Sequence, residues 1–390
     1  MKTTVENNKL TVFLEGRIDT NNAAQTEKDI FDAIGNSGSE DIIFDAEKLE
    51  YISSAGLRVL LKVQKTKDKP IPIINVSRDV YDIFETTGFT ELLDVRKAYR
   101  KVSIEGMTLI GKGLTGDVYR MDNETVLKVF RPNISFDMLI SKENEKARNA
   151  FVAGVPTAIP YDIVKVGDCY GTVYEMLDAK DLVTIIAEDK EHLDDHIKNF
   201  SKTVKAMHSI KVDKFGSQKK EALAALPMLS SALTEDEMKM VRDIYESVPE
   251  RDTFIHGDCH IGNVMIRDGE MMFIDLATAG MGHPIFDMGS MHSLFCDRAN
   301  DPKAIAASPV LCRFTQDEIR RIWSVFIGTY LDTDDEEFIK KATRQIAVLS
   351  LARRLFMVVA MPGMLSPEAF AAMKQGLTAL YGNGMGDICF

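Results

Sequence analysis

The apolar pattern of residues 1–100 predicts a small α/β domain. Short apolar runs have the length and alternation of strands, and the segments between them carry apolar positions at helical spacing. The strands located by this pattern lie at 10–14, 41–44, 71–76 and 92–95. The helices lie at 23–33, 54–65 and 77–87. With one more strand before residue 10, the order is strand, strand, helix, strand, helix, strand, helix and a last strand, which predicts a sheet covered by helices.

Residues 101–178 carry the pattern of a second unit that is rich in strands. Its predicted strands lie at 125–130 and 171–174, after a glycine-rich segment at 109–120. Between the two strands the sequence predicts a helix, which Ser135 can cap and Gly154 can end.

From residue 179 to residue 390 the pattern is helical apart from one predicted hairpin. Apolar residues recur at helical spacing from Leu193 to Met207, which predicts an amphipathic helix ending near His208. Three more helix starts are predicted from capping boxes, in which a Thr is followed three residues later by a Glu. These boxes are Thr234 with Glu237, Thr315 with Glu318, and Thr333 with Glu336.

Length and charge limit the classes of protein that fit. A chain of 390 residues exceeds one ordinary domain, and we divide it into 1–100, 101–178 and 179–390. An apolar fraction of 45% is that of a folded globular protein. The formal net charge of −12 argues against a nucleic-acid partner, because phosphate backbones are bound by clustered Lys and Arg.

Several features predict a cytoplasmic protein without a membrane partner. The most apolar late stretch, 346–361, contains Arg353 and Arg354 at its centre, which favours a buried amphipathic helix over a membrane span. The first residues show no apolar segment of the signal-peptide kind. The five cysteines are scattered and form no CxxC pair, which is typical of a protein in a reducing compartment.

The candidate chemistry lies in a short stretch of the third segment. Asp258 is followed by Asn263 and, twelve residues further on, by Asp275, each beside a short apolar run. We expect a strand, a loop and a strand that bring these oxygen-bearing side chains together, and such hard ligands suit Mg²⁺. An alternative is a zinc or iron site made by His256, Asp258 and His260, but it gives no function to Asn263 and Asp275.

A second candidate group lies in the strand-rich unit. The spacing of Gly111, Gly113, Gly116 and Val118 is typical of a loop that closes over phosphate groups, because glycines let the backbone approach them; the same spacing also marks dinucleotide folds. Lys128 interrupts the apolar run that follows. A buried ammonium group needs an anionic partner, so the sequence predicts one for Lys128, unless the lysine is exposed at a sheet edge.

These residues resemble the kinase-like superfamily. Protein kinases carry H-R-D-L-x-x-x-N and then D-F-G, and here the same spacing runs from His256 through Asp258 to Asn263, followed by Asp275. Gly257 replaces the arginine, and Leu and Ala replace the last two residues of D-F-G. With these changes the stretch resembles the branch of aminoglycoside phosphotransferases and choline kinases. The resemblance implies a bilobal fold, with a small β-rich lobe and a large helical lobe.

The resemblance also implies a reaction, the transfer of the γ-phosphate of ATP to a hydroxyl group with the help of Mg²⁺. Asp258 would orient the hydroxyl and accept its proton. Asn263 and Asp275 would hold the magnesium ion, and Lys128, paired with Glu143, would bind the phosphates.

Other residues receive supporting roles from the same resemblance. Glu175 and Leu177 lie where the backbone of the hinge between the lobes binds adenine, and Glu145 is expected on a solvated face. His256 is expected to be a buried structural histidine. Asp287 is expected to brace the catalytic loop, although an ordinary helix N-cap is an alternative.

Residues 1–100 resemble the STAS domains of anti-sigma-factor antagonists. The resemblance rests on 16–20 and on 49–61. In that family a serine at the start of a helix is phosphorylated by a partner kinase, and the matching position here is Ser54. This implies an anti-sigma factor or another STAS-binding protein as a partner. A serine between a strand and a helix is also a good N-cap, which is the alternative for Ser54.

Three functions are therefore open. The first is a kinase for a small-molecule hydroxyl acceptor such as an aminoglycoside, an amino sugar or an amino alcohol. The second is a protein kinase or regulatory module of a partner-switching system, acting on a STAS serine such as Ser54. The third is a scaffold that binds nucleotide without turnover, which the intact set of Lys, Asp, Asn and Asp gives no reason to prefer. The first is our hypothesis.

Overall fold

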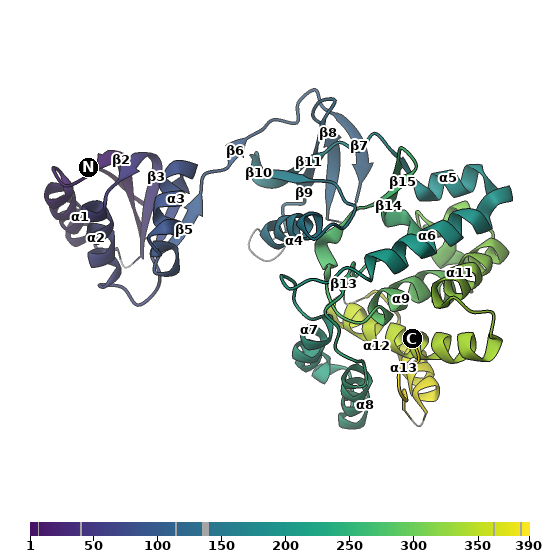
Figure 1. Cartoon of the computed structure of the whole chain (residues 1–390). Coiled ribbons are helices and arrows are strands. Elements are labelled where there is room, and N and C mark those ends of the chain that lie inside the picture. Colours follow the sequence, from purple (N-terminus) through teal and green to yellow (C-terminus); the bar gives the residue numbers. More distant parts are fainter. Residues whose placement is uncertain (7, 40, 114, 135–139, 362, 383) are drawn as a thin grey trace. The chain divides into compact units, whose positions relative to one another are not determined.

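A computed structural model of the chain describes residues 1–390 except 7, 40, 114, 135–139, 362 and 383. The chain divides into two compact units, Met1–Val102 and Ser103–Phe390, each with its own hydrophobic core (Figure 1). The predicted fold class is confirmed, because an α/β unit is followed by a unit with a strand-rich lobe and a helical lobe.

The first unit is a five-stranded sheet with helices between its strands. Its strands follow the order β1 (Lys2–Glu6), β2 (Lys9–Ile18), β3 (Asp41–Ile52), β4 (Pro72–Val76) and β5 (Asp94–Lys97). Its helices are α1 (Ala23–Ser37), α2 (Ser54–Gln64) and α3 (Arg78–Thr86). Only β1 runs antiparallel to its neighbour among the pairs from β1 to β5. The predicted order of elements is confirmed, with ends shifted by a few residues and β3 considerably longer.

The turn from β3 into α2 corrects one assignment. Ser53 is the N-cap of α2, and its hydroxyl accepts hydrogen bonds from the N–H groups of Ala55 and Gly56 at 3.2 and 3.4 Å. Ser54 is the first helical residue and is exposed. The assignment of Ser54 as the N-cap is therefore wrong, because the preceding serine already satisfies these helix donors.

The second unit begins with an antiparallel sheet. From Ser103 on, its strands follow the spatial order β10, β11, β9, β8, β7. They are β7 (Thr108–Lys112), β8 (Gly116–Arg120), β9 (Thr125–Phe130), β10 (Pro160–Val166) and β11 (Cys169–Glu175), and β6 (Arg100–Lys101) lies at the end of the first unit. Helix α4 (Ser141–Val152) follows β9. Gly154, at φ +88°, lies just after its end as predicted, whereas the predicted cap Ser135 lies outside the described residues.

The helical lobe fills the rest of the chain. Its helices are α5 (Leu182–Glu188), α6 (Leu193–Met207), α7 (Gln218–Ala225), α8 (Glu235–Glu246), α9 (Ile285–His292), α10 (Pro302–Ala307), α11 (Gln316–Leu331), α12 (Glu336–Ala360) and α13 (Pro367–Tyr381). Its strands are β12 (Lys180–Asp181), β13 (Phe254–Ile255), β14 (Val264–Arg267), β15 (Glu270–Phe273) and β16 (Gly280–Met281). The expectation of a single hairpin among helices is wrong, since β12 pairs with β14 and β13 pairs with β16.

Two of the three predicted capping boxes are present at helix starts. Thr234 and Thr315 form the predicted capping boxes, each with its Glu three residues later. Thr333 does not, because α12 begins at Glu336 with Asp335 as its N-cap. The Asp335 carboxylate accepts hydrogen bonds from the first N–H groups of this helix, at 3.0 and 3.2 Å, and so takes the place predicted for the threonine.

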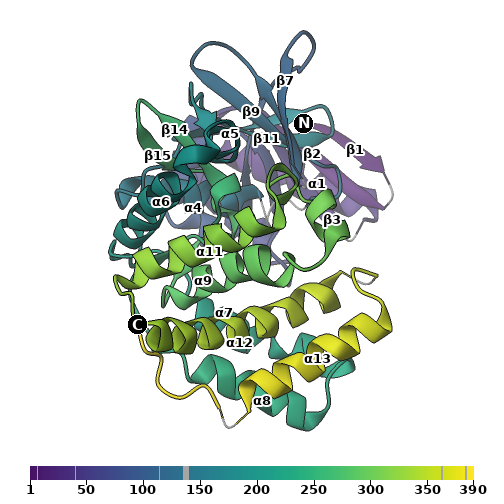
Figure 2. The same cartoon turned by 90° about the vertical axis from the view of Figure 1, so that its right-hand side faces the viewer.

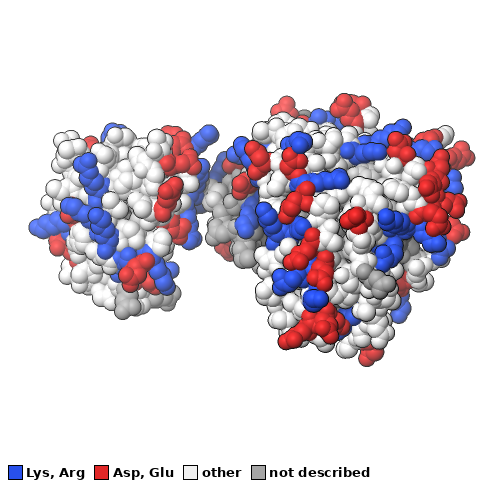
Figure 3. Space-filling view, turned by 60° about the horizontal axis from the view of Figure 1, so that its bottom comes forward, with Lys and Arg blue, Asp and Glu red and all other residues white. Residues whose placement is uncertain are grey.

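Helix packing places α12 next to the functional elements. It packs along α9, and α11 packs along α6 (Figure 2). Among the described residues no helix is both long and apolar enough to cross a membrane. On the face shown in Figure 3, Lys and Arg side chains are interspersed with Asp and Glu over most of the surface.

Candidate functional site

Lys128 lies in the centre of the sheet of the small lobe. Val118 on β8 and Thr172 on β11 pair directly with it, so the three side chains lie on the same face. Lys128 Nζ lies 2.6 Å from Glu143 Oε1 and 3.7 Å from Asp275 Oδ1, and its side chain is 14% exposed. This ammonium group therefore joins a helix of the small lobe to the hairpin region of the large lobe.

Glu143 is a buried carboxylate. Its Oε1 also accepts a hydrogen bond from the Tyr174 hydroxyl at 3.2 Å, while its Oε2 is buried without a hydrogen-bond partner among the described residues. Burial raises the pKa of Glu143, although the charge and hydrogen bond of Lys128 act to lower it. The other acid on this helix, Glu145, is exposed. Burial and distance thus place Glu143, and not Glu145, beside Lys128.

The glycine-rich segment forms the hairpin of β7 and β8, which we call the glycine hairpin (residues 108–120). The Gly113 N–H donates to the Gly116 carbonyl at 2.8 Å across its tip. A Cβ at Gly116 would overlap the Val129 carbonyl, whereas a Cβ at Gly111 would lie at an ordinary 3.5 Å from Val118. Gly116 is thus needed for packing between strands, whereas a Cβ at Gly111 would fit against Val118.

The stretch between β13 and β14, residues 256–263, forms the catalytic loop of the resemblance. Asn263 Nδ2 donates to the Asp258 carbonyl at 2.8 Å and lies 3.5 Å from Asp258 Oδ2. The Ile274 N–H donates to the Asn263 carbonyl at 3.0 Å, which places Asp275 next to this pair. A series of contacts therefore runs from Lys128 to Asp275, from the neighbouring Ile274 N–H to Asn263, and from Asn263 to Asp258.

Asp275 has an uncommon backbone conformation. Its φ is +61° and its ψ is 64°, in the left-handed region that residues other than glycine seldom adopt. Such conformations cost free energy and gather at functional sites. The side chains of Asp275 and Asp258 are both 51% exposed, so these carboxylates are open to a ligand.

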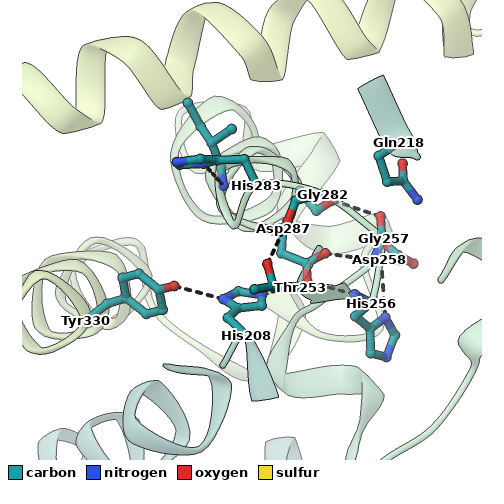
Figure 4. Close-up of polar contacts among 12 residues, drawn as sticks. His208, Gln218, Thr253, His256, Gly257, Asp258, Gly282, His283, Asp287 and Tyr330 are labelled. Carbon is teal, nitrogen blue, oxygen red and sulfur yellow. Dashed lines mark hydrogen bonds and ion pairs between the residues drawn. The ribbon is translucent and has the colours of Figure 1, made fainter. Parts of the chain in front are cut away.

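Asp287 holds the catalytic loop from behind. Its carboxylate accepts hydrogen bonds from the N–H groups of His256 and Gly257 at 2.8 and 2.7 Å (Figure 4). His208 Nε2 lies 2.9 Å from the same carboxylate, and the Tyr330 hydroxyl lies 2.9 Å from the other ring nitrogen. Burial alone would raise the pKa of Asp287, but these hydrogen bonds and the nearby histidine charges outweigh it and lower the pKa.

The alternative role of Asp287 as a helix N-cap is wrong. The N-cap of α9 is Pro284, and Asp287 lies within the first turn. Its oxygens are directed to the loop instead. His208 and Tyr330, which complete this buried network, carried no sequence signal, because they lie 79 and 122 positions from their partners in the network.

The two histidines of the loop do not form a metal site with Asp258. His256 is fully buried, donates from Nε2 to the Ile274 carbonyl at 3.0 Å, and accepts the Asp258 N–H at Nδ1 at 3.3 Å. Both of its ring nitrogens are therefore engaged. Within the described part of the chain no group of three His, Cys, Asp or Glu side chains is placed to hold a metal ion. The alternative of a zinc or iron site at these three residues is wrong for this reason.

His260 lies beside Asp258. Its Nδ1 accepts the Gly262 N–H at 3.0 Å, and its Nε2 lies 3.7 Å from Asp258 Oδ2. Burial lowers the pKa of His260, although the Asp258 charge acts to raise it. The imidazole is therefore expected to be neutral near pH 7.

The hinge residues differ from each other. The Glu175 N–H donates to the Ile159 carbonyl at 2.9 Å, and its carboxylate pairs with Arg267 on β14 at 2.7 Å. Leu177 is 8% exposed and packs in a small apolar cluster with Ala158 and Met272. Glu175 thus connects the two lobes, and its N–H is already used. Leu177 lines the boundary between the lobes.

Two further residues hold the backbone after Asp275. Lys146 on α4 donates to the Ala277 carbonyl at 3.1 Å, and Gln218 on α7 donates to the Thr278 carbonyl at 2.7 Å. Sequence reasoning missed both, because a side chain bonded to a distant carbonyl leaves no local pattern.

The chemistry of this donor set fits a magnesium nucleotide. The amide nitrogen of Asn263 is used within the loop, which leaves its oxygen for a ligand. Together with the Asp275 carboxylate it offers hard oxygen donors of the kind that Mg²⁺ prefers. Lys128 lies next to them and could bind phosphate oxygens.

Comparison with known proteins agrees with this geometry. The sequence model described as the phosphotransferase enzyme family matches residues 106–308, more than half of the chain. The chain belongs to this phosphotransferase family. A second sequence model, that of the STAS domain, matches residues 1–103, so the first unit is a STAS domain. Both resemblances seen in the sequence are thereby confirmed.

Individual relatives cover either part. The Bordetella bronchiseptica protein named putative anti-sigma factor antagonist BtrV is 32% identical over 85 residues, which are 21% of this chain and 72% of BtrV.

Solved structures resemble the phosphotransferase part. A choline/ethanolamine kinase family protein of Mesorhizobium loti is 16% identical, with 71% of this chain and 88% of that chain covered and a TM-score of 0.45. Plasmodium vivax ethanolamine kinase is 14% identical, with 70% and 81% covered and a TM-score of 0.46. An aminoglycoside 2′-phosphotransferase mutant in complex with GDP is 12% identical, with 78% and 98% covered and a TM-score of 0.43. Similarities of this size do not decide the acceptor.

Proposed function

We propose that this chain is an ATP- and Mg²⁺-dependent phosphotransferase that moves the γ-phosphate to a hydroxyl of a small molecule. The acceptor class is an aminoglycoside, an amino sugar or an amino alcohol. The observation that carries the proposal is the series of contacts from Glu143 and Lys128 through Asp275 and Asn263 to Asp258. A purely structural ion pair would not need the exposed carboxylates at the other end of this series.

Each residue then has one task. Lys128, held by Glu143, binds phosphate oxygens of the nucleotide. Asn263 and Asp275 hold the magnesium ion. The bound magnesium nucleotide supplies the phosphoryl group, with part of its charge neutralised. Asp258 orients the acceptor hydroxyl and accepts its proton as the hydroxyl oxygen bonds to the γ-phosphorus, while the bond from that phosphorus to the bridging oxygen breaks and ADP leaves.

The remaining assigned residues shape the nucleotide site. The glycine hairpin covers the phosphates, with Gly111, Gly113 and Gly116 as the positions of close approach and Val118 packing beside Lys128. Adenine binds at the hinge near Leu177, because the Glu175 N–H is already bonded within the protein. His256 and Asp287 keep the catalytic loop in place. The preference for ATP over GTP and a cytoplasmic location are carried over from the family and from composition.

The test uses the full chain with γ-labelled ATP, MgCl₂ and a panel of amino alcohols, amino sugars and aminoglycosides. Label transfer to a panel member supports the proposal. Asp258→Ala should reduce this turnover at least ~10²-fold while nucleotide binding, measured by calorimetry, stays nearly unchanged. Glu145→Ala, an exposed acid of the same unit, serves as the matched control. Equal turnover of Asp258→Ala and the parent would remove the catalytic assignment.

A second candidate function is supported by the turn before α2. The Ser54 hydroxyl is exposed and Ser53 does the capping, so Ser54 is open to modification. A phosphate there would lie at a helix N-terminus, which favours negative charge. In this alternative the second unit phosphorylates a STAS serine, and the STAS domain binds an anti-sigma factor or another STAS-binding protein.

Phosphopeptide mapping separates the two functions. After incubation with MgATP alone, a phosphorylated Ser54 that disappears in Ser54→Ala but not in Ser53→Ala supports the second function. Unmodified protein whose ATP consumption rises with a small-molecule acceptor supports the first.

A further inference from the structure

Arg353 on α12 reaches the catalytic loop from the far end of the chain. Its guanidinium donates hydrogen bonds to the Gly257 carbonyl and to Ser290 Oγ. The Ser290 hydroxyl in turn donates to the same Gly257 carbonyl at 3.1 Å. Two linked donors, one from α9 and one from α12, therefore hold a single carbonyl.

This carbonyl belongs to the residue directly before Asp258. The Gly257 N–H is held by the Asp287 carboxylate at 2.7 Å, so Gly257 is fixed by hydrogen bonds on both its N–H and its carbonyl side. Its φ of +83° lies in a region where the chain tolerates little besides glycine. A glycine without such partners has wide conformational freedom. The partners therefore decide the direction in which the chain enters Asp258.

Arg353 differs from its neighbour in sequence. Arg354 forms an ion pair with Asp297 at 3.4 Å. Arg353 is half-buried and has no carboxylate within ion-pair distance in the part of the chain that the structure describes. A partly buried cation without an acid is costly unless other groups compensate it. Here the compensating groups are the Gly257 carbonyl and the Ser290 hydroxyl, next to the catalytic loop.

We propose that Arg353 is a positioning residue for phosphoryl transfer. Together with Ser290 it fixes the Gly257 carbonyl and so sets the orientation of Asp258 toward the acceptor hydroxyl. Arg353 touches none of the reacting groups and acts through the loop. The catalytic consequence rests on the function proposed above, but the effect on the loop does not. Arg353 also lies beyond residue 308, where the match to the family sequence model ends.

The first experiment measures amide hydrogen exchange of the full chain and needs no activity. In Arg353→Gln the peptide covering 256–263 should exchange about tenfold faster or more, because the loop loses a holding group. Arg354→Gln is the matched control, with the same chemical change one position along the helix, and should leave this peptide unchanged. Peptides of the STAS domain should be unchanged in both variants. Equal exchange of 256–263 in Arg353→Gln and the parent would overturn the proposal.

The second experiment measures ATP hydrolysis with MgATP, with water as the acceptor. Arg353→Gln should lower kcat about tenfold to a hundredfold, since misplacement of a catalytic group costs this much, and leave the KM for ATP unchanged. Arg353→Lys should recover part of kcat, because it keeps the charge and one donor. A normal kcat, or a change in KM alone, would contradict the proposal. A parent chain that neither binds nor hydrolyses MgATP would refute the proposed function, and the exchange result would still decide the role of Arg353 in the loop.

Discussion

The glycine hairpin and the catalytic loop both belong to the candidate site, but they differ in burial and in the hydrogen bonds that hold their backbones. Four of the five residues of β7 are exposed, among them Leu109 and Ile110 at 40% and 48%. In the catalytic loop His256 is fully buried, and its backbone N–H, like that of Gly257, is bound by the buried Asp287 carboxylate. The loop is anchored by the core of the large lobe, whereas the hairpin rests on the edge of a sheet.

This difference matches the two tasks proposed for these segments. Groups that take part in a reaction must be held within a fraction of an ångström, which requires anchored partners on every side. A cover over a nucleotide must open and close, so it belongs to the less stable parts of a fold. The following predictions test whether the two segments differ in this way, and the single tryptophan, Trp323 in α11, reports unfolding of the second unit by fluorescence.

The largest effect is expected for Asp287→Ala. The change leaves the buried His208 and the N–H groups of His256 and Gly257 without their acceptor, and it should lower the free energy of unfolding by about 3–5 kcal/mol. Urea unfolding followed by Trp323 fluorescence measures this. The exposed Asp317→Ala on the helix that carries Trp323 is the control, with an expected change below about 0.5 kcal/mol. A similar small change for Asp287→Ala would mean that the loop is not anchored as described.

Gly257→Ala should come next. A Cβ there would overlap the Thr278 carbonyl, and φ is +83°. Gly269 has a φ of +86° but no atom within 4 Å of an added Cβ. Gly269→Ala should therefore show only the cost of the left-handed conformation, about 1–2 kcal/mol, and Gly257→Ala should lose a further 1–3 kcal/mol or so from overlap. Equal losses in urea unfolding would show that the loop can move aside.

Lys128→Met tests the residue between the two segments. The pKa of Glu143 is raised above its usual 4.5, so the folded protein holds this proton more tightly than the unfolded chain. Stability from this group is thus present below pH 4.5 and is lost as pH rises through the higher folded pKa. Without the Lys128 charge the pKa of Glu143 rises further. The free energy of unfolding of Lys128→Met therefore keeps falling to higher pH than that of the parent, by about 2–3 kcal/mol in all.

Urea unfolding of Lys128→Met between pH 5 and pH 8 checks this. The double variant Lys128→Met with Glu143→Gln should remove the added pH dependence. The prediction would be contradicted if the free energy of unfolding changed with pH in the same way in Lys128→Met and in the parent.

The smallest effect on stability is expected for Gly111→Ala in the glycine hairpin. The added Cβ meets Val118 at an ordinary distance, so the free energy of unfolding should change by no more than about 0.5 kcal/mol. Affinity for MgATP should nevertheless fall, since the glycine hairpin is proposed to close over the phosphates and a side chain there would hinder the approach of its backbone. Calorimetric titration measures the affinity. Gly116→Ala, which overlaps the Val129 carbonyl, should instead lower stability. The reverse ranking would remove the distinction between the two glycines.

Much of the fold could be predicted from short-range patterns. The elements of the STAS domain, helix α6 and two of three capping boxes followed from spacing over a few residues. The third box failed because a better cap, Asp335, lies two positions after Thr333, and Ser54 failed as a cap for the same kind of reason. Competing acceptor side chains one or two residues apart look alike in sequence, and the path of the backbone decides which of them receives the N–H groups of the helix.

The candidate site was predictable where its residues form a motif. Asp258 and Asn263 come before the hairpin of β14 and β15, and Asp275 comes after it. Lys128 is marked by its position in an apolar strand. Ser290 and Arg353, which hold the Gly257 carbonyl, are not marked, since the guanidinium bonds a carbonyl 96 positions away. Contacts of this kind depend on the packing of α9 against α12.

The amino-acid order alone indicated the elements of the STAS domain, helix α6, the glycine positions and the candidate catalytic groups, because each of these shows in patterns among near neighbours. Chain packing decided what the sequence left open: the catalytic loop and not a helix end as the partner of Asp287, and Arg353 as a partner of the Gly257 carbonyl. A buried polar group must find its hydrogen-bond partner among whatever groups the folded chain brings beside it.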